Sequence, residues 1–381
     1  MKKIGMFTAA VFFCCLSVGL ATDVISTKTH SLDNGLTVLV SEMPASSTVS
    51  LYGLVKAGSA TEGKYLGAGL SHFMEHMLFK GTERRGPGDI PNEIQSLGGT
   101  INASTGLDYT IYTITVPKEK AGQAADILSD MLFNAKFDPQ ELKREREVVF
   151  NEIRLYRDRP ERYLSELVFS TAYQVHPYRI PVIGFKELLA PLTREDFLDY
   201  YHSRYVPNNI LISFAGGIDS ATALELANQY FGRYSRGQYA LQPLPVEPRQ
   251  RVFRFREEYY STQLIQGSLS YQGVDVNDED MVALDALAMI LGQGRGSRLF
   301  QALVERRKVV HSITASNFTP KDPGLFEIEF SLEEGDVDQV VSLIEKQIKE
   351  IQEKGVTEAE LEKVVNSSLK DLFLNQETSW G

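Results

Sequence analysis

The segment from Tyr65 to Lys80 contains two histidines, His72 and His76, that lie four positions apart. Its apolar residues recur at helical spacing and Gly81 closes the pattern, so we predict a helix. Residues four apart lie one above the other on the same face of a helix, and both imidazoles can therefore reach one metal ion. A catalytic zinc site usually takes three protein ligands, so a second element has to pack against this helix and supply the third.

Glu75 stands between the two histidines, in the run His72-Phe-Met-Glu75-His76. On a helix it projects toward the same space as the histidines and need not be a ligand itself. A bound metal lowers the pKa of a coordinated water to about 7, and a nearby carboxylate can then accept its proton. The pattern predicts a catalytic metal site. The alternatives are a structural metal site and a helix face that carries two histidines by accident.

The third ligand can come from a helix that we predict over residues 139–157, with Asp138 as its N-cap and a proline at its first position. Glu145 and Glu152 border the apolar stripe of this helix, whereas Glu147 points away from it. Glu145 and Glu152 are seven positions, or two turns, apart, so both can face one site. Their spacing does not choose between them.

The first 21 residues have the pattern of a secretory signal peptide, with Lys2 and Lys3 before an apolar stretch and small residues near Ala21. An uncleaved membrane anchor is the alternative. Cleavage removes both cysteines, Cys14 and Cys15, and takes the net charge from −11 to −13. We therefore expect an exported protein, periplasmic or secreted, without disulfides. Its acidity argues against a broad nucleic-acid surface and would favour basic or neutral peptides.

The order of predicted elements is repeated in outline along the chain. We expect a metal-bearing domain over residues 22–241, a linker over residues 242–250 that contains three prolines, and a second, related domain over residues 251–381. Each half should be an antiparallel sheet with helices packed on one face, an α+β fold. The second half lacks a metal motif and ends on a predicted helix, so we expect it to be the less complete of the two.

Local turn and cap signals support this outline. The sequence Asp33-Asn34-Gly35 between two strand-like segments predicts a β-hairpin. Thr357, with Glu360 three positions later, predicts a capping box at the start of the last helix.

The run around His72 and the later Glu145-Arg-Glu-Val-Val-Phe-Asn-Glu152 resemble the pitrilysin/insulinase family of inverted-zincin peptidases, and most closely its mitochondrial processing peptidase-like branch. In that family the third zinc ligand is a glutamate some 76 positions after the second histidine, and the residue 76 positions after His76 is Glu152. The resemblance implies one zinc ion per chain, Glu75 as general base, and Glu145 as a partner that orients a ligand.

The resemblance also implies a peptide-binding edge strand in the segment Gly98–Thr105. Its candidate substrate-binding residues are Asn102, Ala103, Ser104 and Thr105, where a peptide would add as an extra strand. From the residues alone, an ordinary covered strand is equally consistent. His176 and Tyr205 also match landmarks of the family, and we expect both to be structural.

One departure from the family pattern concerns a partner subunit. Self-sufficient members carry an arginine and, seven residues later, a tyrosine that grip the substrate carbonyl. The corresponding positions here are Val304 and His311, and neither can do the same work. This implies the zinc-bearing subunit of a two-chain peptidase, whose related partner supplies the Arg/Tyr pair. We expect His311 to be a core histidine, with a substitute hydrogen-bond donor as the alternative.

The function predicted is hydrolysis of peptide bonds in short or unfolded polypeptides. A non-catalytic or conditionally active subunit is the first alternative, and the presence of Glu75 argues against a pure scaffold. A metallohydrolase of a non-peptide substrate is the second, and the segment 102–105 argues against it because extended backbone recognition suits peptides.

Overall fold

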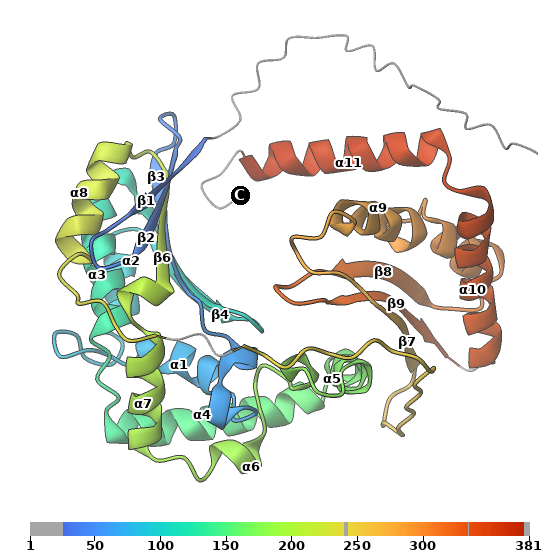
Figure 1. Cartoon of the computed structure of the whole chain (residues 1–381), viewed down its shortest axis with the longest axis horizontal. Coiled ribbons are helices and arrows are strands. Elements are labelled where there is room, and N and C mark those ends of the chain that lie inside the picture. Colours follow the sequence, from blue (N-terminus) through green and yellow to red (C-terminus); the bar gives the residue numbers. More distant parts are fainter. Residues whose placement is uncertain (1–25, 240–242, 334, 377–381) are drawn as a thin grey trace, which may run out of the picture.

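The computed structural model describes residues 26–239, 243–333 and 335–376. Its architecture is α+β, as predicted, with two sheets that lie side by side and helices stacked on the outer side of each (Figure 1). The predicted signal peptide and both cysteines lie outside the described residues. Among the described residues, no helix is both long enough and apolar enough to cross a bilayer.

The first half is built on a six-stranded sheet in the order β1-β2-β6-β3-β5-β4. Neighbouring strands are antiparallel except for β2 and β6, which run parallel and depart from the expected all-antiparallel pairing. The strands are β1 (Thr27–Ser31), β2 (Thr37–Glu42), β3 (Thr48–Val55), β4 (Thr100–Thr105), β5 (Thr110–Pro117) and β6 (Ile210–Gly216).

The predicted hairpin joins β1 to β2. Asn34 fixes its turn: the side-chain oxygen accepts the Leu36 amide at 3.1 Å, and the side-chain amide donates to the carbonyl of Phe231 at 2.9 Å. Gly35 has φ +84°, in the left-handed region that glycine tolerates.

In the first half, α3 and α8 lie along the outer face of this sheet, and α1 contacts β4 and β5 (Figure 1). The helices of this half are α1 (Leu70–Leu78), α2 (Asp89–Ser96), α3 (Ala121–Phe133), α4 (Pro139–Arg157), α5 (Pro160–Ala172), α6 (Lys186–Leu189), α7 (Arg194–Arg204) and α8 (Ser220–Tyr230). Short 3-10 turns occur at Ser59–Thr61, Gly63–Tyr65, Lys118–Lys120, Pro177–Arg179 and Pro207–Asn209. One apolar core joins the sheet to these helices, with Leu51, Phe73 and Phe214 fully buried within it.

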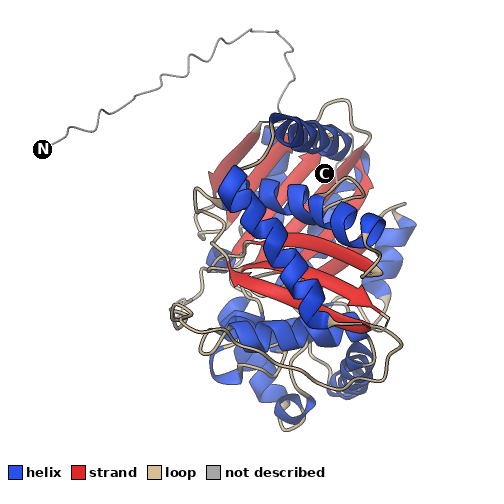
Figure 2. Cartoon of the chain, turned by 90° about the vertical axis from the view of Figure 1, so that its right-hand side faces the viewer, coloured by secondary structure: helices blue, strands red, loops and turns tan. Residues whose placement is uncertain are grey.

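The second half has a three-stranded antiparallel sheet in the order β7-β9-β8, made of β7 (Ile265–Gln272), β8 (Ser312–Phe318) and β9 (Leu325–Leu332). Its helical elements are α9 (Met281–Gly292), a π-helical segment (Phe300–Arg306), α10 (Val337–Lys354) and α11 (Glu358–Gln376). Helices α9 and α10 lie in front of this sheet in Figure 2, whereas α11 runs across the top of the molecule in Figure 1. Ile328 and Phe330 of β9 pack with Ile344 of α10 in a separate apolar core.

The two halves repeat one unit. In each, a strand and a helix precede two further strands, and the sheet orders β3-β5-β4 and β7-β9-β8 correspond strand for strand. Strand β8 was not anticipated in the sequence. The domain boundaries stay predictions. The first residue of the predicted linker, Gln242, lies outside the described residues.

Two local predictions are corrected. The metal-bearing helix begins at Leu70 instead of about Tyr65, because Gly67 and Gly69 have left-handed backbones with φ +90° and +69°. His311 is not a core histidine: it is exposed at the start of β8, and its backbone amide donates to the carbonyl of Ser331 at 2.6 Å. His311 precedes β8 and lies outside the alternation that buries Ile313 and Ala315 in the second core.

Candidate metal centre

Two kinds of contact hold helix α1 in place: its apolar face packs on the first core, and a buried carboxylate accepts hydrogen bonds at its N-terminus. Phe73, Met74 and Met77 are buried in the core. Glu62, which is 1% exposed, accepts the backbone amides of Gly69 at 3.1 Å and Ser71 at 2.9 Å. Burial raises the pKa of Glu62 to about 8 despite these bonds. The carboxylate of Glu62 therefore satisfies backbone amides at the start of the helix that are buried away from water.

The close approach of the backbone at the same end requires glycine. A Cβ on Gly69 would stand 2.2 Å from the carbonyl oxygen of Ile183, so no other residue fits there without moving the chain. The N-terminus of α1 is thus locked against the segment around Ile183.

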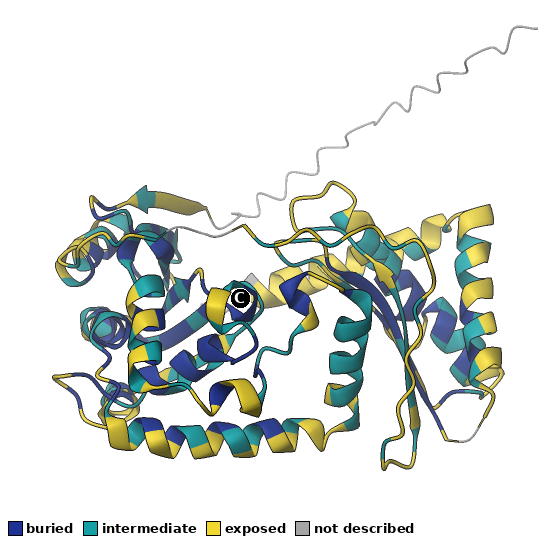
Figure 3. Ribbon diagram, turned by 60° about the horizontal axis from the view of Figure 1, so that its bottom comes forward, coloured by how far each residue is buried: buried dark blue, intermediate teal, exposed yellow. Residues whose placement is uncertain are grey.

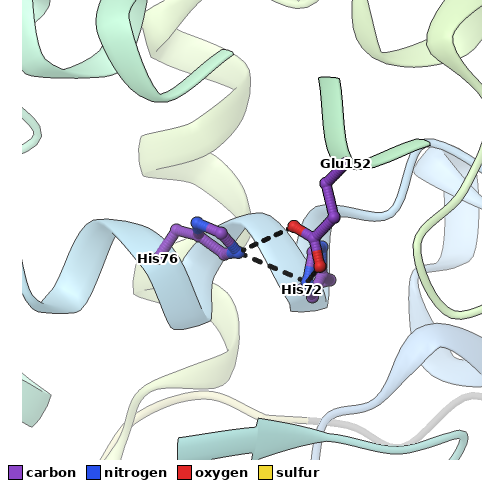
Figure 4. Close-up of side chains that lie close together, drawn as sticks. All are labelled: His72, His76 and Glu152. Carbon is purple, nitrogen blue, oxygen red and sulfur yellow. Dashed lines mark hydrogen bonds and ion pairs between the residues drawn. The ribbon is translucent and has the colours of Figure 1, made fainter. Parts of the chain in front are cut away.

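His72, His76 and Glu152 meet at one point between α1 and α4 (Figure 4). The two Nε2 atoms of the histidines are 3.3 Å apart. The Glu152 carboxylate lies 3.7 Å from Nε2 of His72 and 3.5 Å from Nε2 of His76. Three ligand-type atoms therefore converge from two helices that are separated by more than 60 positions of sequence.

The separation of the two histidines fits a tetrahedral metal ion. With zinc-to-ligand distances of about 2.0–2.1 Å, two ligands of a regular tetrahedron stand roughly 3.3–3.4 Å apart. The 3.3 Å between the Nε2 atoms matches that spacing, and the Glu152 carboxylate lies close by, with Oε1 3.7 Å from His72 and Oε2 3.5 Å from His76. The donor set, two imidazoles and one carboxylate, is also one that zinc accepts.

Glu145 lies on the far side of His76. Its carboxylate is 3.6 Å from Nδ1 of His76 and 2.6 Å from Nζ of Lys80, and its side chain is only 5% exposed. Burial alone would raise the pKa of Glu145, but the hydrogen bonds from His76 and Lys80 outweigh it and lower that pKa. The geometry thus separates the two candidates that spacing left open: Glu152 faces the converging Nε2 atoms, and Glu145 supports His76 from behind.

The two histidines differ in charge before any metal binds. Burial, reinforced by repulsion from His76, lowers the pKa of His72 to about 4. Burial also opposes a charge on His76, but hydrogen bonds to Glu145 and Glu152 outweigh it and raise its pKa to about 9. The hydrogen bond to His76 lowers the pKa of Glu152. The metal-free site therefore holds one imidazolium between two carboxylates.

Glu75 lies beside this group without belonging to it. Its Oε2 accepts a hydrogen bond of 2.6 Å from the hydroxyl of Thr105, and burial raises the pKa of Glu75. A carboxylate with a raised pKa that is held in one orientation beside a metal site is suited to accept and return a proton.

The four candidate substrate residues lie on β4, which forms the edge of the six-stranded sheet. Asn102 and Ser104 are exposed, whereas Ala103 and Thr105 are half-buried on the alternate face. Because Thr105 bonds to Glu75, that alternate face is the one that meets α1. The other edge of β4 is unpaired among the described strands, so it can accept hydrogen bonds from an added strand.

Two groups that contact the site were not predicted from the sequence in these roles: Lys80, which pairs with Glu145, and the hydroxyl of Thr105, which bonds to Glu75. Lys80 lies four positions after His76 on the same helix, a signal that could have been read. The bond from Thr105 to Glu75 depends on how β4 meets α1, and no local pattern encodes that. Glu147 is exposed, as predicted.

The other landmarks lie apart from the trio. His176 is 3% exposed and Tyr205 is 5% exposed. The Tyr205 hydroxyl pairs with that of Tyr112 at 2.9 Å, and Nε2 of His176 lies 3.5 Å from Asp322. Both side chains are buried and hydrogen-bonded or ion-paired within the protein, and their structural role stays a prediction. Val304 packs against the second core and offers no side-chain donor.

Protein-family models match both halves. Residues 37–185 match the model described as insulinase (peptidase family M16), and residues 191–368 match the model described as the peptidase M16 inactive domain. The candidate metal centre lies entirely within the first match.

Curated relatives cover most of the chain. An uncharacterized zinc protease of Bacillus subtilis, YmxG, is 30% identical over 353 residues, which cover 92% of this chain and 85% of the relative. A protein of Arabidopsis thaliana named probable mitochondrial-processing peptidase subunit beta is 29% identical over 312 residues, 79% of this chain and 58% of the relative.

Solved structures share the fold. A protease from Helicobacter pylori superposes with a TM-score of 0.89 at 25% identity and covers 93% of this chain and 86% of its own. The periplasmic protease PqqL of Escherichia coli gives a TM-score of 0.70 at 22% identity over 93% of this chain and 41% of its own.

Proposed function

The chain belongs to the insulinase (peptidase M16) family, and on that premise we propose that it is an exported zinc endopeptidase. The observation that carries the proposal is the convergence of His72, His76 and Glu152, with one ligand-type atom of each within 4.8 Å of the others, beside Glu75. Relatives named zinc proteases support zinc as the metal.

The residues divide the work by position. His72, His76 and Glu152 would hold the zinc ion, which when bound lowers the pKa of a coordinated water and polarises the substrate carbonyl. Glu75 accepts the proton of the attacking water and delivers it to the leaving amine. Glu145, paired with Lys80, keeps Nδ1 of His76 engaged and so orients the ring.

The substrate that suits this site is an extended peptide. The exposed edge of β4 offers backbone groups to an added strand, and Asn102 and Ser104 stand on its exposed face. A substrate that pairs along β4 runs beside Thr105, whose hydroxyl bonds to Glu75. Strand addition reads the backbone, so we expect short or unfolded polypeptides to be cleaved with limited sequence preference.

We further propose that a related subunit completes the substrate site. The positions at which self-sufficient members carry arginine and tyrosine are Val304, which packs in the second core, and the exposed His311. One relative is itself named a subunit of a processing peptidase. Export rests on the leader pattern of residues 1–21, with an uncleaved anchor as the alternative.

A non-catalytic subunit is the second candidate, because the model that matches residues 191–368 is described as an inactive domain. That match excludes the region of the metal trio. A scaffold has no use for Glu75 or for the hydroxyl that orients it, so the first candidate is favoured.

The test is cleavage of a mixed quenched-peptide library by the zinc-loaded chain, beside Glu75→Gln and the matched control Glu147→Gln, which changes an exposed glutamate of α4. Cleavage that Glu75→Gln abolishes and Glu147→Gln keeps supports a self-sufficient peptidase. Cleavage that appears only with a co-purified related chain supports the paired form. A folded, zinc-loaded chain that stays inactive with such a partner present would contradict the proposal.

A further inference from the structure

The tip of the β4–β5 hairpin, residues 105–109, contacts the candidate base on one side and the second half of the molecule on the other. We propose that Asp108 and Tyr178 are positioning residues, which tie the loop 319–324 of the second half to this hairpin tip and thereby hold Glu75 in its working orientation. The inference rests on the proposed peptidase function only for its kinetic consequence.

The first side of the tip is the contact with α1. Thr105 is the last residue of β4, and its hydroxyl donates to Glu75 at 2.6 Å. This is the one hydrogen bond to the Glu75 carboxylate among the described residues. Any shift of the tip therefore changes the orientation of that carboxylate.

The tip itself is packed tightly against the segment 58–60. Backbone amides of Ser59 and Ala60 donate to the carbonyls of Gly106 and Leu107 at 3.2 and 2.9 Å. A Cβ on Gly58 would stand 2.4 Å from the carbonyl oxygen of Leu107, so the two backbones are in direct contact. Such a tip transmits a displacement from one end to the other because it has little room to deform.

The second side of the tip is the carboxylate of Asp108. The hydroxyl of Tyr178 donates to it at 2.8 Å, and the backbone amide of Lys321 donates to its Oδ2 at 3.0 Å. The amide of Asp322 in turn donates to the Tyr178 hydroxyl at 3.2 Å. Tyr178 is completely buried. Asp108 and Tyr178 thus join the hairpin tip to two consecutive amides of the second half.

The loop 319–324 is well placed to act as a fixed point. It connects β8 to β9, and Gly324 exchanges backbone hydrogen bonds with Gly273 and Val274, at 2.9 and 3.1 Å, next to β7. The position of the second sheet therefore sets the position of Lys321 and Asp322, and through Asp108 that of the hairpin tip.

A neighbouring contact supplies the matched control. The hydroxyl of Tyr173 donates to the carbonyl of Pro323 at 2.9 Å, so it joins the same loop to the first half. Tyr173 is 4% exposed and packs beside Tyr178, with ring centroids 5.7 Å apart. Among the described residues its hydroxyl makes no hydrogen bond to the hairpin tip, and the two share an apolar cluster against which Leu107 packs. Tyr173→Phe removes a buried hydroxyl from the same interface without touching Asp108.

The experiment is a double-mutant cycle on the zinc-loaded chain, with its partner if activity requires one. We expect Tyr178→Phe and Thr105→Val each to lower kcat about tenfold, with KM and zinc content unchanged, and the double variant to be no slower than Thr105→Val alone. Thr105→Ser, which keeps the hydroxyl, should retain activity. Tyr173→Phe should leave kcat within about twofold, and its effect should multiply with that of Thr105→Val.

Multiplicative losses from Tyr178→Phe and Thr105→Val, or an equal loss in Tyr173→Phe, would overturn the proposal. Asp108→Asn replaces Tyr178→Phe if that variant does not fold.

Amide hydrogen exchange gives a readout that needs no activity. Tyr178→Phe should speed exchange at the tip amides of Gly106 and Tyr109, whereas Tyr173→Phe should not. Unchanged exchange at the tip in Tyr178→Phe contradicts the proposal even in an inactive chain. If the wild-type chain is inactive but Tyr178→Phe still speeds exchange at the tip, the result contradicts only the proposed function.

Discussion

The two halves of the molecule share one scaffold and differ in the side chains placed on it. Helix α1 follows β3 and carries His72, Glu75 and His76, whereas the corresponding helix α9 follows β7 and reads MVALDALAMILG. The one ionisable residue of α9, Asp285, is engaged by Asn317 at 2.9 Å. Among the described residues, one group alone has three ligand-type side chains close enough to share a metal, and it lies in the first half. The proposed chemistry therefore depends on a few polar residues and not on the fold that both halves share.

The faces that the two sheets turn away from their helices differ as well. In the second half, Glu327 and Glu329 project from β9 on the side opposite Ile328 and Phe330. Glu327 is 7% exposed and has no hydrogen bond or ion pair among the described residues. In the first half, hydrogen bonds from His76 and Lys80 outweigh the burial of Glu145, whereas burial raises the pKa of Glu62 as it does that of Glu327.

The long helices of the two halves also differ in how much of their surface is exposed (Figure 3). Helix α4 alternates buried and exposed positions because one side packs on the first core. Helix α11 is exposed along nearly its whole length in the described chain. Its predicted capping box is confirmed, since the Glu360 carboxylate accepts the Thr357 amide at 2.8 Å and the Thr357 hydroxyl accepts the Glu360 amide at 3.3 Å.

The largest effect that separates the halves is expected from Glu75→Gln. The change keeps the shape of the side chain but removes the proton acceptor, so peptide cleavage should fall by about 10²–10⁴-fold. Zinc content should stay at the wild-type value because Glu75 is not a ligand. Asp285→Asn, at the only ionisable position of α9, is the matched change in the second half and should leave cleavage near wild type. Full activity in Glu75→Gln would refute the assigned base.

Loss of the contact between Glu145 and Nδ1 of His76 should have the next largest effect, on zinc affinity. Glu145→Gln removes the charge that pairs with His76 and Lys80, and we expect zinc affinity to fall by about 10–100-fold. Competition against a chelator of known affinity measures it. Glu147→Gln, two positions along the same helix but exposed, should match the wild type. Equal affinities for all three proteins would remove Glu145 from the metal site.

Zinc binding should release protons in a pH-dependent way. His76 has a pKa of about 9 in the metal-free protein, so it is protonated at pH 7 and must lose its proton to bind a metal, whereas His72, with a pKa of about 4, is already neutral. We expect His76 to release about one proton per zinc at pH 7, in addition to the protons lost by zinc-bound water, and this His76 contribution to disappear as the pH rises through 9. Calorimetry in buffers of different ionisation enthalpy measures the number. No proton released at pH 7 would contradict the charge state assigned to His76.

The smallest effect concerns stability and belongs to the second half. Burial raises the pKa of Glu327 from 4.5 to about 7, and repulsion from Glu329 adds to it. The folded state thus favours the protonated form, so stability is lost as pH rises from about 4.5 to 7 and stays reduced above that range. Glu327→Gln should remove this loss and raise the free energy of unfolding by about 1–3 kcal/mol at pH 8, with little change at pH 4.

Thermal unfolding at the two pH values, beside the exposed control Glu257→Gln, measures the effect of Glu327→Gln. A gain of the same size at both pH values would show that ionisation of Glu327 is not the cause.

Most residues of the candidate metal centre could be predicted from the sequence because the pattern that places them is local. The four-residue spacing of His72 and His76 fixes their common face on any helix, and the apolar stripe of α4 places Glu145 and Glu152 at its border. Whether Glu145 or Glu152 meets the Nε2 atoms depends on how α4 crosses α1, which spacing alone does not encode.

The parts that could not be predicted depend on tertiary contacts. The parallel pairing of β2 with β6 joins strands about 170 positions apart. Strand β8 has polar residues at its exposed positions and no strong turn before it. The exposure of His311 follows from its place just before that strand, outside the residues that alternate into the core. The bond from Thr105 to Glu75 and the contact of Asp108 with Lys321 join segments that no local pattern relates.

The most direct test of the account is the location of the metal. Anomalous diffraction at the zinc absorption edge, from crystals of the zinc-loaded chain, should give one peak per chain within about 2.0–2.2 Å of His72, His76 and Glu152 and none in the second half. A peak coordinated by Glu145 in place of Glu152, or a zinc-loaded protein with no density between α1 and α4, would contradict it.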